Sequence, residues 1–260
     1  MRCESLTGKG FYGTVRKVFI AASLLLLCLT GCEKVPEPTV TTTAPTTVPV
    51  TETTTPVTTA PPETVPPTTE PPVYVSELAV EDFLMPVEDY SWERQFAPEF
   101  VMVHFTSAIV THREEPYHLP HIRDIFVQYN TSVHYIIERD GKIHCYVPED
   151  RVAWHAGAGE WKGEEKYFNS MNQYAIGIEL VGMGSQGDMS VYLTEGEYKA
   201  IDDSLKGFTP EQYAALRLLV EDICQRNGIP MDREHVIGHS EYATRKSDPG
   251  ELFDWAQLIP

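Results

Sequence analysis

The chain has 260 residues, of which 42% are hydrophobic and 22% are charged, as in a soluble globular protein with one or two domains. Its formal net charge of -18 at pH 7 argues against a nucleic-acid partner and against electrostatic adhesion to anionic lipid. The composition is uneven along the chain, and three successive segments differ in kind.

The first segment, residues 1–31, has the features of a secretory signal peptide. Arg16 and Lys17 precede an apolar run at 18–29 that is too short for a comfortable membrane span. The run ends in "LTGC", which resembles the bacterial lipobox, whose cysteine is lipidated and becomes the mature N-terminus; a chance match around a free cysteine is the alternative. We therefore expect lipidation at Cys32, and acyl chains that anchor the protein to the cell membrane outside the cytoplasm.

The second segment, residues 32–75, is predicted to be a disordered tether. Residues 36–72 are rich in threonine and proline and contain no glycine, aromatic or basic residue, so they cannot bury a core. A polyproline II backbone of about 3.1 Å per residue would let this tether reach on the order of 100 Å.

The cysteine count is small once the signal peptide is removed. Signal cleavage and lipidation of Cys32 would leave Cys145 and Cys224, which permit one disulfide but no disulfide framework.

The third segment, residues 76–260, is long enough for one domain with a full core. Residues 99–106 ("EFVMVHFT") are apolar and β-branched, as in a buried strand. Residues 134–147 contain two strand-like runs around the dipeptide "DG", which is a strong hairpin signal. Residues 174–182 ("YAIGIELVG") form a third apolar strand that carries one carboxylate.

Two helices are predicted between and after these strands. Residues 119–130 have apolar side chains at helical spacing. A longer helix begins after Thr209, which forms a capping box with Gln212 and is followed by Pro210 at the first helical position, and Gly228 ends it. Its apolar stripe consists of Tyr213, Leu216, Leu219, Val220 and Ile223. Strands covered by helices, with a hairpin among them, predict an α/β domain with a mixed sheet.

Three side chains have types suited to a metal site. His104 lies near the end of the first predicted strand, and His239 and Asp248 lie in the segment "GHSEYATRKSDPG". Two imidazoles and one carboxylate leave a fourth tetrahedral position for water, which is the arrangement of a catalytic zinc site. Taken without further context, scattered histidines and aspartates are more often surface or core groups that bind nothing.

Two other patterns compete with this site. The segment "HREEPYHLPH" brings His112, His118 and His121 together as a candidate metal site, although its prolines favour a solvated loop. Residues 182–187 match GxGxxG after a strand, but we predict no helix opening there and no surrounding βαβ unit, so a dinucleotide site is not expected. Residues 182–207 sustain neither helical nor strand periodicity and are interpreted as an insertion beside a cleft.

Five segments together carry a resemblance to a known family: "VMVHFTS", "HYIIERDGKIHCYVPEDRVAWHAG", "NQYAIGIELVG", "FTPEQYAALRLLV" and "GHSEYATRKSDPG". In this order, between residues 99 and 255, they resemble the zinc-dependent N-acetylmuramoyl-L-alanine amidases of the amidase-2 type, relatives of peptidoglycan recognition proteins. The resemblance implies a single α/β domain, with a central mixed sheet flanked by helices and one zinc ion in a surface groove. It also implies peptidoglycan or muropeptides as substrate, and we expect a monomer.

The same resemblance implies the roles of individual residues. His104, His239 and Asp248 fall on the zinc-ligand positions. Glu179 in "GIELVG" and Lys246 in "RKSDPG" fall on the two catalytic positions. A glutamate can transfer the proton between water and the leaving amine, and a lysine can stabilise an oxyanion. The implied reaction is hydrolysis of the amide between N-acetylmuramic acid and L-alanine.

His155 in "WHAG" and Arg245 are assigned to substrate binding by the resemblance, although a packed imidazole beside Trp154 is an equal alternative for His155. The segment 239–248 is one residue shorter than in the recycling relatives, which affects where Arg245 and its neighbour point. The insertion at 182–207 has no clear counterpart. Two rival functions remain open: a peptidoglycan-binding module without turnover, and a zinc peptidase that cuts within the stem peptide.

Overall fold

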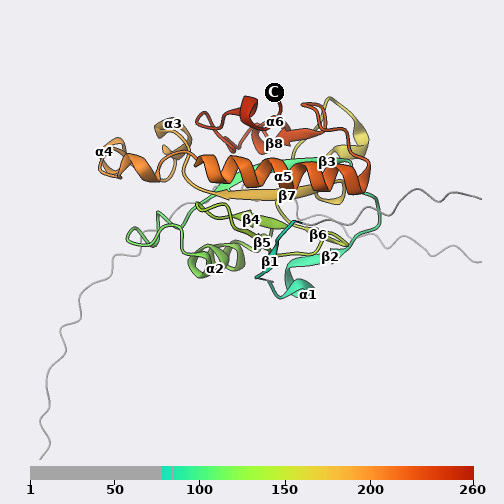
Figure 1. Ribbon diagram of the computed structural model, residues 1–260, viewed down its shortest axis with the longest axis horizontal. Coiled ribbons are helices and arrows are strands. Elements are labelled where there is room, and N and C mark those ends of the chain that lie inside the picture. Colours follow the sequence, from blue (N-terminus) through green and yellow to red (C-terminus); the bar gives the residue numbers. More distant parts are fainter. Residues whose placement is uncertain (1–77, 84) are drawn as a thin grey trace, which may run out of the picture. The chain divides into compact units, whose positions relative to one another are not determined.

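Residues 78–83 and 85–260 are described in the computed structural model. They form a central mixed β-sheet with helices on both sides, as the sequence predicts (Figure 1). The predicted signal peptide, Cys32 and the predicted tether lie outside the described residues. Within the described part of the chain, no helix is long and apolar enough to cross a membrane.

The main sheet has six strands, four of which run parallel. In spatial order they are β1 (Glu81–Asp82), β5 (Ile143–Cys145), β4 (Tyr135–Ile137), β7 (Ala175–Val181), β3 (Phe100–Thr106) and β8 (Val236–Gly238). Strands β4, β7, β3 and β8 are parallel, whereas β5 is antiparallel to β4 and parallel to β1. A separate antiparallel pair consists of β2 (Ser91–Glu93) and β6 (Arg151–Ala153).

Helix α5 (Pro210–Asn227) covers one face of this sheet, and its ends follow the sequence prediction. The Thr209 hydroxyl accepts a hydrogen bond from the Gln212 backbone N–H at 3.1 Å, and the Gln212 side chain accepts one from the Thr209 N–H at 3.0 Å. Gly228 closes the helix in the left-handed region with φ of 67°. The capping box and the glycine therefore set both ends of α5 locally.

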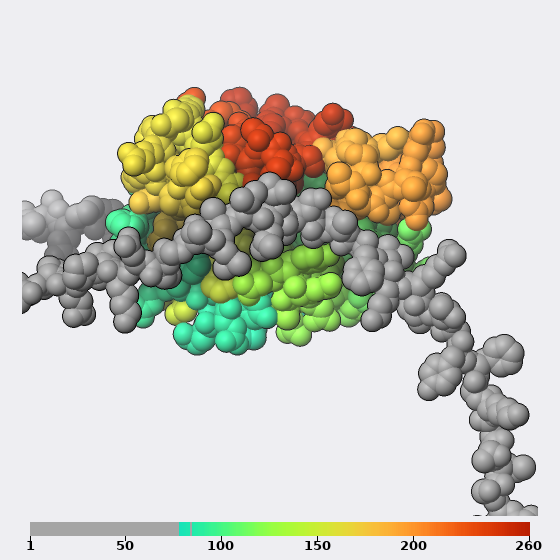
Figure 2. Space-filling view, turned by 180° about the vertical axis from the view of Figure 1, so that it is seen from behind, coloured from blue at the N-terminus to red at the C-terminus, as the bar shows by residue number. Residues whose placement is uncertain are grey.

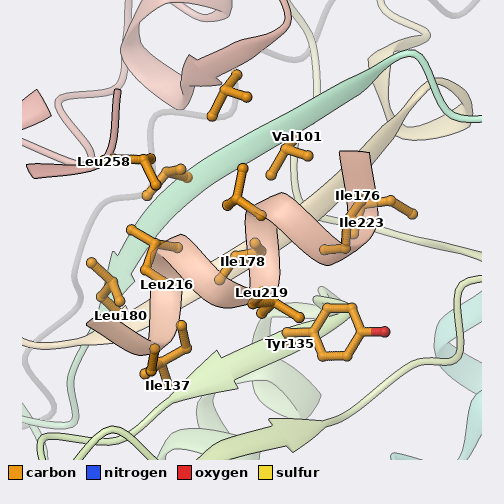
Figure 3. Packing of buried hydrophobic residues seen from close by; sticks show 14 of the residues in the cluster. Val101, Tyr135, Ile137, Ile176, Ile178, Leu180, Leu216, Leu219, Ile223 and Leu258 are labelled. Carbon is orange, nitrogen blue, oxygen red and sulfur yellow. The ribbon is translucent and has the colours of Figure 1, made fainter. Parts of the chain in front are cut away.

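The main hydrophobic core lies between α5 and the sheet. All residues of the predicted apolar stripe are buried, and Leu216, Leu219 and Ile223 point from α5 toward Val101 on β3 and Ile178 on β7 (Figure 3). The predicted stripe is thus confirmed as the sheet-facing side of the helix.

Helix α2 (Leu119–Tyr129) packs on the opposite face of the sheet, where Ile122 and Phe126 contact Ile136 of β4. The other helical elements are short. They are α1 (Val87–Tyr90), α3 (Gln186–Met189), α4 (Glu195–Lys199) and α6 (His239–Tyr242), with 3₁₀ turns η1 (Glu165–Tyr167), η2 (Met171–Gln173), η3 (Asp203–Leu205) and η4 (Trp255–Gln257).

The predicted hairpin is confirmed as β4 and β5, with Gly141 in its turn at φ of 86°. The segment 182–207 corrects one prediction, because a helix does open within it: Ser185 caps α3. Helix α3 has only four residues and is followed by α4 instead of a strand, so a dinucleotide unit is still not formed. The segment packs its own apolar side chains, including Met183 and Tyr198, against the loop after β3.

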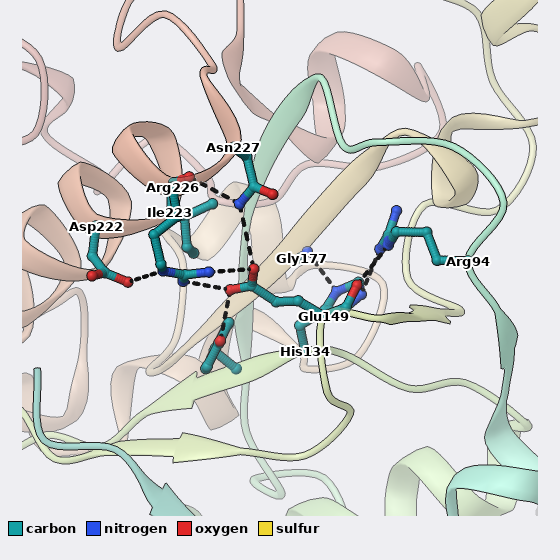
Figure 4. A network of polar contacts seen from close by, with 9 residues as sticks. Arg94, His134, Glu149, Gly177, Asp222, Ile223, Arg226 and Asn227 are labelled. Atoms are coloured by element: carbon teal, nitrogen blue, oxygen red, sulfur yellow. Dashed lines mark hydrogen bonds and ion pairs between the residues drawn. The ribbon is translucent and has the colours of Figure 1, made fainter. Parts of the chain in front are cut away.

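An ion-pair network ties the end of α5 to the sheet (Figure 4). Arg226 donates to both carboxylate oxygens of Glu149 at 2.9 Å and to Asp222 at 2.7 Å. Glu149 also accepts a hydrogen bond from the Tyr135 hydroxyl of β4 at 2.7 Å.

The cysteine count permits one disulfide between Cys145 and Cys224. In the described part of the chain this disulfide is absent, because the thiols of Cys145 on β5 and Cys224 on α5 are both free.

Candidate metal centre and active site

The candidate site lies at the carboxyl ends of the parallel strands, where open α/β sheets place their ligands. His104 is on β3 and is the register partner of Glu179 on β7. His239 follows β8, the other neighbour of β3, as the first residue of α6. Three adjacent strands therefore deliver one polar side chain each to the same edge.

His104, His239 and Asp248 bring one atom each to a common point. The Nδ1 atoms of the two histidines are 3.1 Å apart, and Asp248 Oδ2 lies 2.7 Å from His104 Nδ1 and 3.0 Å from His239 Nδ1. A tetrahedral zinc ion with bonds of about 2.0–2.1 Å holds its ligand atoms about 3.3 Å apart. The donor set and its spacing thus fit a zinc ion after shifts of a few tenths of an ångström.

The electrostatics of the three side chains also suit a cation. Burial is the main cause that lowers the pKa of His104 to about 4, so its imidazole is neutral and able to coordinate at pH 7. Burial alone would favour a protonated Asp248, but hydrogen bonds with His104 and His239 hold its pKa below the usual range. The centre therefore presents the neutral imidazole of His104 and the negative charge of Asp248.

A tight turn carries Asp248 back to His239. The backbone N–H of Ser240 donates to the carbonyl of Asp248 at 2.9 Å, and that of Lys246 donates to Ala243 at 2.8 Å. Gly238 allows this closure, because a Cβ there would lie 2.7 Å from Pro249 Cδ. The shortened segment thus still brings both predicted ligands together.

Glu179 is 7% exposed and has a carboxylate oxygen, Oε2, that is buried without a hydrogen-bond partner among the described residues. Burial and then the nearby Asp248 raise the pKa of Glu179 well above its usual value, while the positive charge of Lys246 opposes the rise. A carboxylate with a raised pKa beside a metal centre is suited to general acid–base catalysis near neutral pH.

His155 supports a ligand from behind. Its Nδ1 lies 3.1 Å from His104 Nε2, and its own Nε2 is buried. Gly177 of β7 makes room for it, because a Cβ on Gly177 would be 2.6 Å from the His155 ring. The backbone N–H of Gly177 donates a hydrogen bond to Nδ1 of another histidine, His134, at 2.9 Å (Figure 4). The structure therefore places His155 against the predicted metal ligand.

His239 has a corresponding support, since its Nε2 lies 2.8 Å from the carbonyl oxygen of Ala156. Outer partners of this kind set the tautomer and orientation of metal-binding imidazoles. The sequence does not predict these roles of Ala156 and Gly177. Ala156 acts through its backbone carbonyl, and Gly177 acts by leaving room for the His155 ring, and neither leaves a pattern in neighbouring residues.

The two basic residues of the 239–248 segment point differently. Lys246 is exposed, and its charge acts on Glu179 and His104. Arg245 donates to the carbonyl of Ala158 and lines a hollow of about 270 Å³ together with Phe168. Lys246 thus acts electrostatically on the candidate centre, whereas Arg245 is held at the Ala158 carbonyl.

Three segments far apart in sequence meet on this side of the molecule. Residues near 240–250, drawn in red, lie between the yellow segment near 155–170 and the orange segment near 185–205 (Figure 2). Of these segments, 155–170 and 240–250 meet at the candidate centre through the contact between Ala156 and His239.

Residues 94–251 match the family Amidase_2, described as N-acetylmuramoyl-L-alanine amidase. This match covers more than half of the chain, so the protein belongs to that family. The chain is 32% identical over 141 residues to the 1,6-anhydro-N-acetylmuramyl-L-alanine amidase AmpD of Haemophilus influenzae, which is 54% of this chain and 62% of that protein. It is 37% identical over 135 residues to the N-acetylmuramoyl-L-alanine amidase AmiD of Escherichia coli, which is 49% of this chain and 43% of that protein.

A solved structure of Escherichia coli AmiD, in complex with the substrate anhydro-N-acetylmuramic acid-L-Ala-D-gamma-Glu-L-Lys, is 30% identical to this chain with a TM-score of 0.47. The alignment covers 62% of this chain and 56% of that chain. Across these comparisons the chain spans less than two thirds of each relative's length.

Proposed function

We propose that this protein hydrolyses the amide bond between N-acetylmuramic acid and L-alanine in peptidoglycan or muropeptides, with one zinc ion as cofactor. The observation that carries the proposal is a buried Glu179 with an unpaired oxygen among the described residues, on the strand next to the His104 ligand position. Family membership supplies the substrate class, since the matched family is described as N-acetylmuramoyl-L-alanine amidase.

Each side chain has a distinct task in this reaction. His104, His239 and Asp248 would hold the zinc ion, which when bound polarises the scissile carbonyl and lowers the pKa of water. Glu179 accepts the proton of the attacking water and passes it to the leaving amine, for which its raised pKa is well matched. Lys246 places a positive charge where the carbonyl oxygen becomes negative.

Digestion of isolated peptidoglycan, followed by mass spectrometry, tests the proposal. The expected products are stem peptides with a free L-alanine N-terminus and glycan chains with free lactyl carboxyl groups. Glu179→Ala should retain zinc and lose all cleavage. Unmodified muropeptides after digestion with the zinc-loaded protein would instead indicate a binding module, and cuts between amino acids would indicate a peptidase.

We further propose that the protein works outside the cytoplasm, anchored to the cell membrane through lipid on Cys32. The signal-like segment and the "LTGC" sequence support this location, and the threonine- and proline-rich tether would let the domain reach the cell wall. Metabolic labelling with a fatty-acid analogue should mark the wild-type protein and should fail to mark Cys32→Ala.

A further inference from the structure

A second group of potential metal ligands occurs in the loop between β3 and α2. His112, Glu115, His118 and His121 follow one another at a spacing of three residues. Each is linked to the next by a backbone hydrogen bond: Glu115 N–H to His112, His118 N–H to Glu115, and His121 N–H to His118, at 3.2, 3.3 and 3.0 Å. These successive turns keep the four residues close together along the loop.

The side chains of this group are gathered in space as well as in sequence. One ligand atom from each of Glu115, His118 and His121 lies within 4.8 Å of the other two. The His121 ring contacts His118 with centroids 4.7 Å apart and stacks on His112 at 3.7 Å. His121 Nδ1 is buried and has no hydrogen-bond partner among the described residues, which leaves a ring nitrogen that a ligand could satisfy.

We propose that Glu115, His118 and His121 form a second binding site for a divalent transition metal such as zinc. Imidazole nitrogens and a carboxylate oxygen suit such ions and leave a coordination position for water. Tetrahedral coordination needs separations of about 3.3 Å, so side-chain shifts of about 1.5 Å or less would close the site. Glu115 and His118 are exposed and can make these shifts by rotation.

The loop that carries this second site is joined to the 182–207 segment. Arg113 forms an ion pair with Glu197, and the Tyr117 hydroxyl donates to the carbonyl of Leu205. An ion bound at residues 115–121 would therefore order a loop that follows His104 on β3 and supports the inserted segment. The second site shares no ligand with the proposed catalytic centre.

Counting bound zinc per chain tests this proposal. Metal-free protein without a histidine tag is dialysed against a zinc buffer. The buffer keeps the concentration of free zinc too low for isolated surface carboxylates to bind it, and the zinc bound to the protein is measured by mass spectrometry. Wild-type protein should bind two ions per chain, whereas Glu115→Gln combined with His118→Ala should bind one. Neither change should disturb folding, because both residues are exposed and the His118 side chain makes no helix-capping hydrogen bond.

A matched control and a variant of the other centre complete the experiment. Glu114→Gln changes the adjacent carboxylate, outside the three-residue spacing, and should keep two ions. His239→Ala removes a ligand of the catalytic centre and should keep one ion, which His118→Ala in the same background should abolish. The proposal is overturned if His239→Ala binds none, or if Glu115→Gln with His118→Ala binds as much as wild type. One ion in both wild type and His239→Ala would support the second site and count against the catalytic one.

Discussion

Replacing His155 with alanine should weaken zinc binding about 10–100-fold, because the imidazole is the hydrogen-bond partner of a metal ligand. When His104 coordinates through Nδ1, its Nε2 carries the proton and points at His155 Nδ1, 3.1 Å away. Burial, and then the positive charge that neighbouring imidazoles would carry, lower the pKa of His155 well below its usual value, so the ring is neutral and able to accept.

The size of the effect follows from this contact. A buried N–H left without an acceptor costs about 1–3 kcal/mol, and every 1.4 kcal/mol is about a factor of ten in affinity. Loss of this one hydrogen bond should therefore lower the zinc affinity about 5–150-fold. This interval includes the loss of about 10–100-fold in metal affinity that is typical when a hydrogen-bond partner of a metal ligand is removed. His155→Asn should recover part of the affinity, because its side-chain oxygen can accept near the position of Nδ1.

Competition titration with a chromophoric zinc chelator measures this affinity, with Glu115→Gln and His118→Ala as the common background so that only the catalytic centre binds zinc. His235→Ala provides a control, since His235 is only half-buried and bonds to Asp232 instead of a metal ligand. If His155→Ala binds zinc as tightly as wild type and changes only the KM for muropeptides, then His155 acts on the substrate and the reasoning from the 3.1 Å contact is wrong.

Three further perturbations probe the base, the core and the lysine. Glu179→Gln should raise the Tm of the metal-free protein at neutral pH, because a carboxyl whose pKa is raised on folding costs stability once it ionises. The gain should shrink as the pH falls and disappear by about pH 3, where the carboxyl is protonated in both the folded and the unfolded state. A gain in Tm that stays constant across pH would contradict this. Leu216→Ala should lower the free energy of unfolding by about 3–5 kcal/mol in urea titrations because its side chain is fully buried, whereas Leu218→Ala, at a 55% exposed position, should cost less than about 0.5 kcal/mol. Lys246→Ala should reduce kcat about 10²-fold in steady-state hydrolysis, and an equal loss in Arg245→Ala would mean that the loop acts only through its net charge.

The elements that could be predicted are those whose signals lie within a few consecutive residues. The capping box at Thr209, the apolar stripe of α5 and the glycine at its end define that helix without reference to the rest of the chain. Strands β3 and β7 are long enough for an apolar run to be recognised, whereas β8 has only three residues and shows no periodicity. Its place beside β3 comes from packing, yet it is the strand that positions His239.

The sequence by itself determined the α/β class, the main helix and, through the motifs it shares with the amidases, which residues to examine as ligands and catalysts. Only the tertiary structure decided how they meet: that His155 lies behind His104, that Arg245 turns to Ala158 while Lys246 acts on Glu179, and that Glu115 joins two histidines in a second group. The physical reason is that local backbone preferences are encoded in neighbouring residues. Contacts between side chains tens of residues apart depend on how strands and loops pack together.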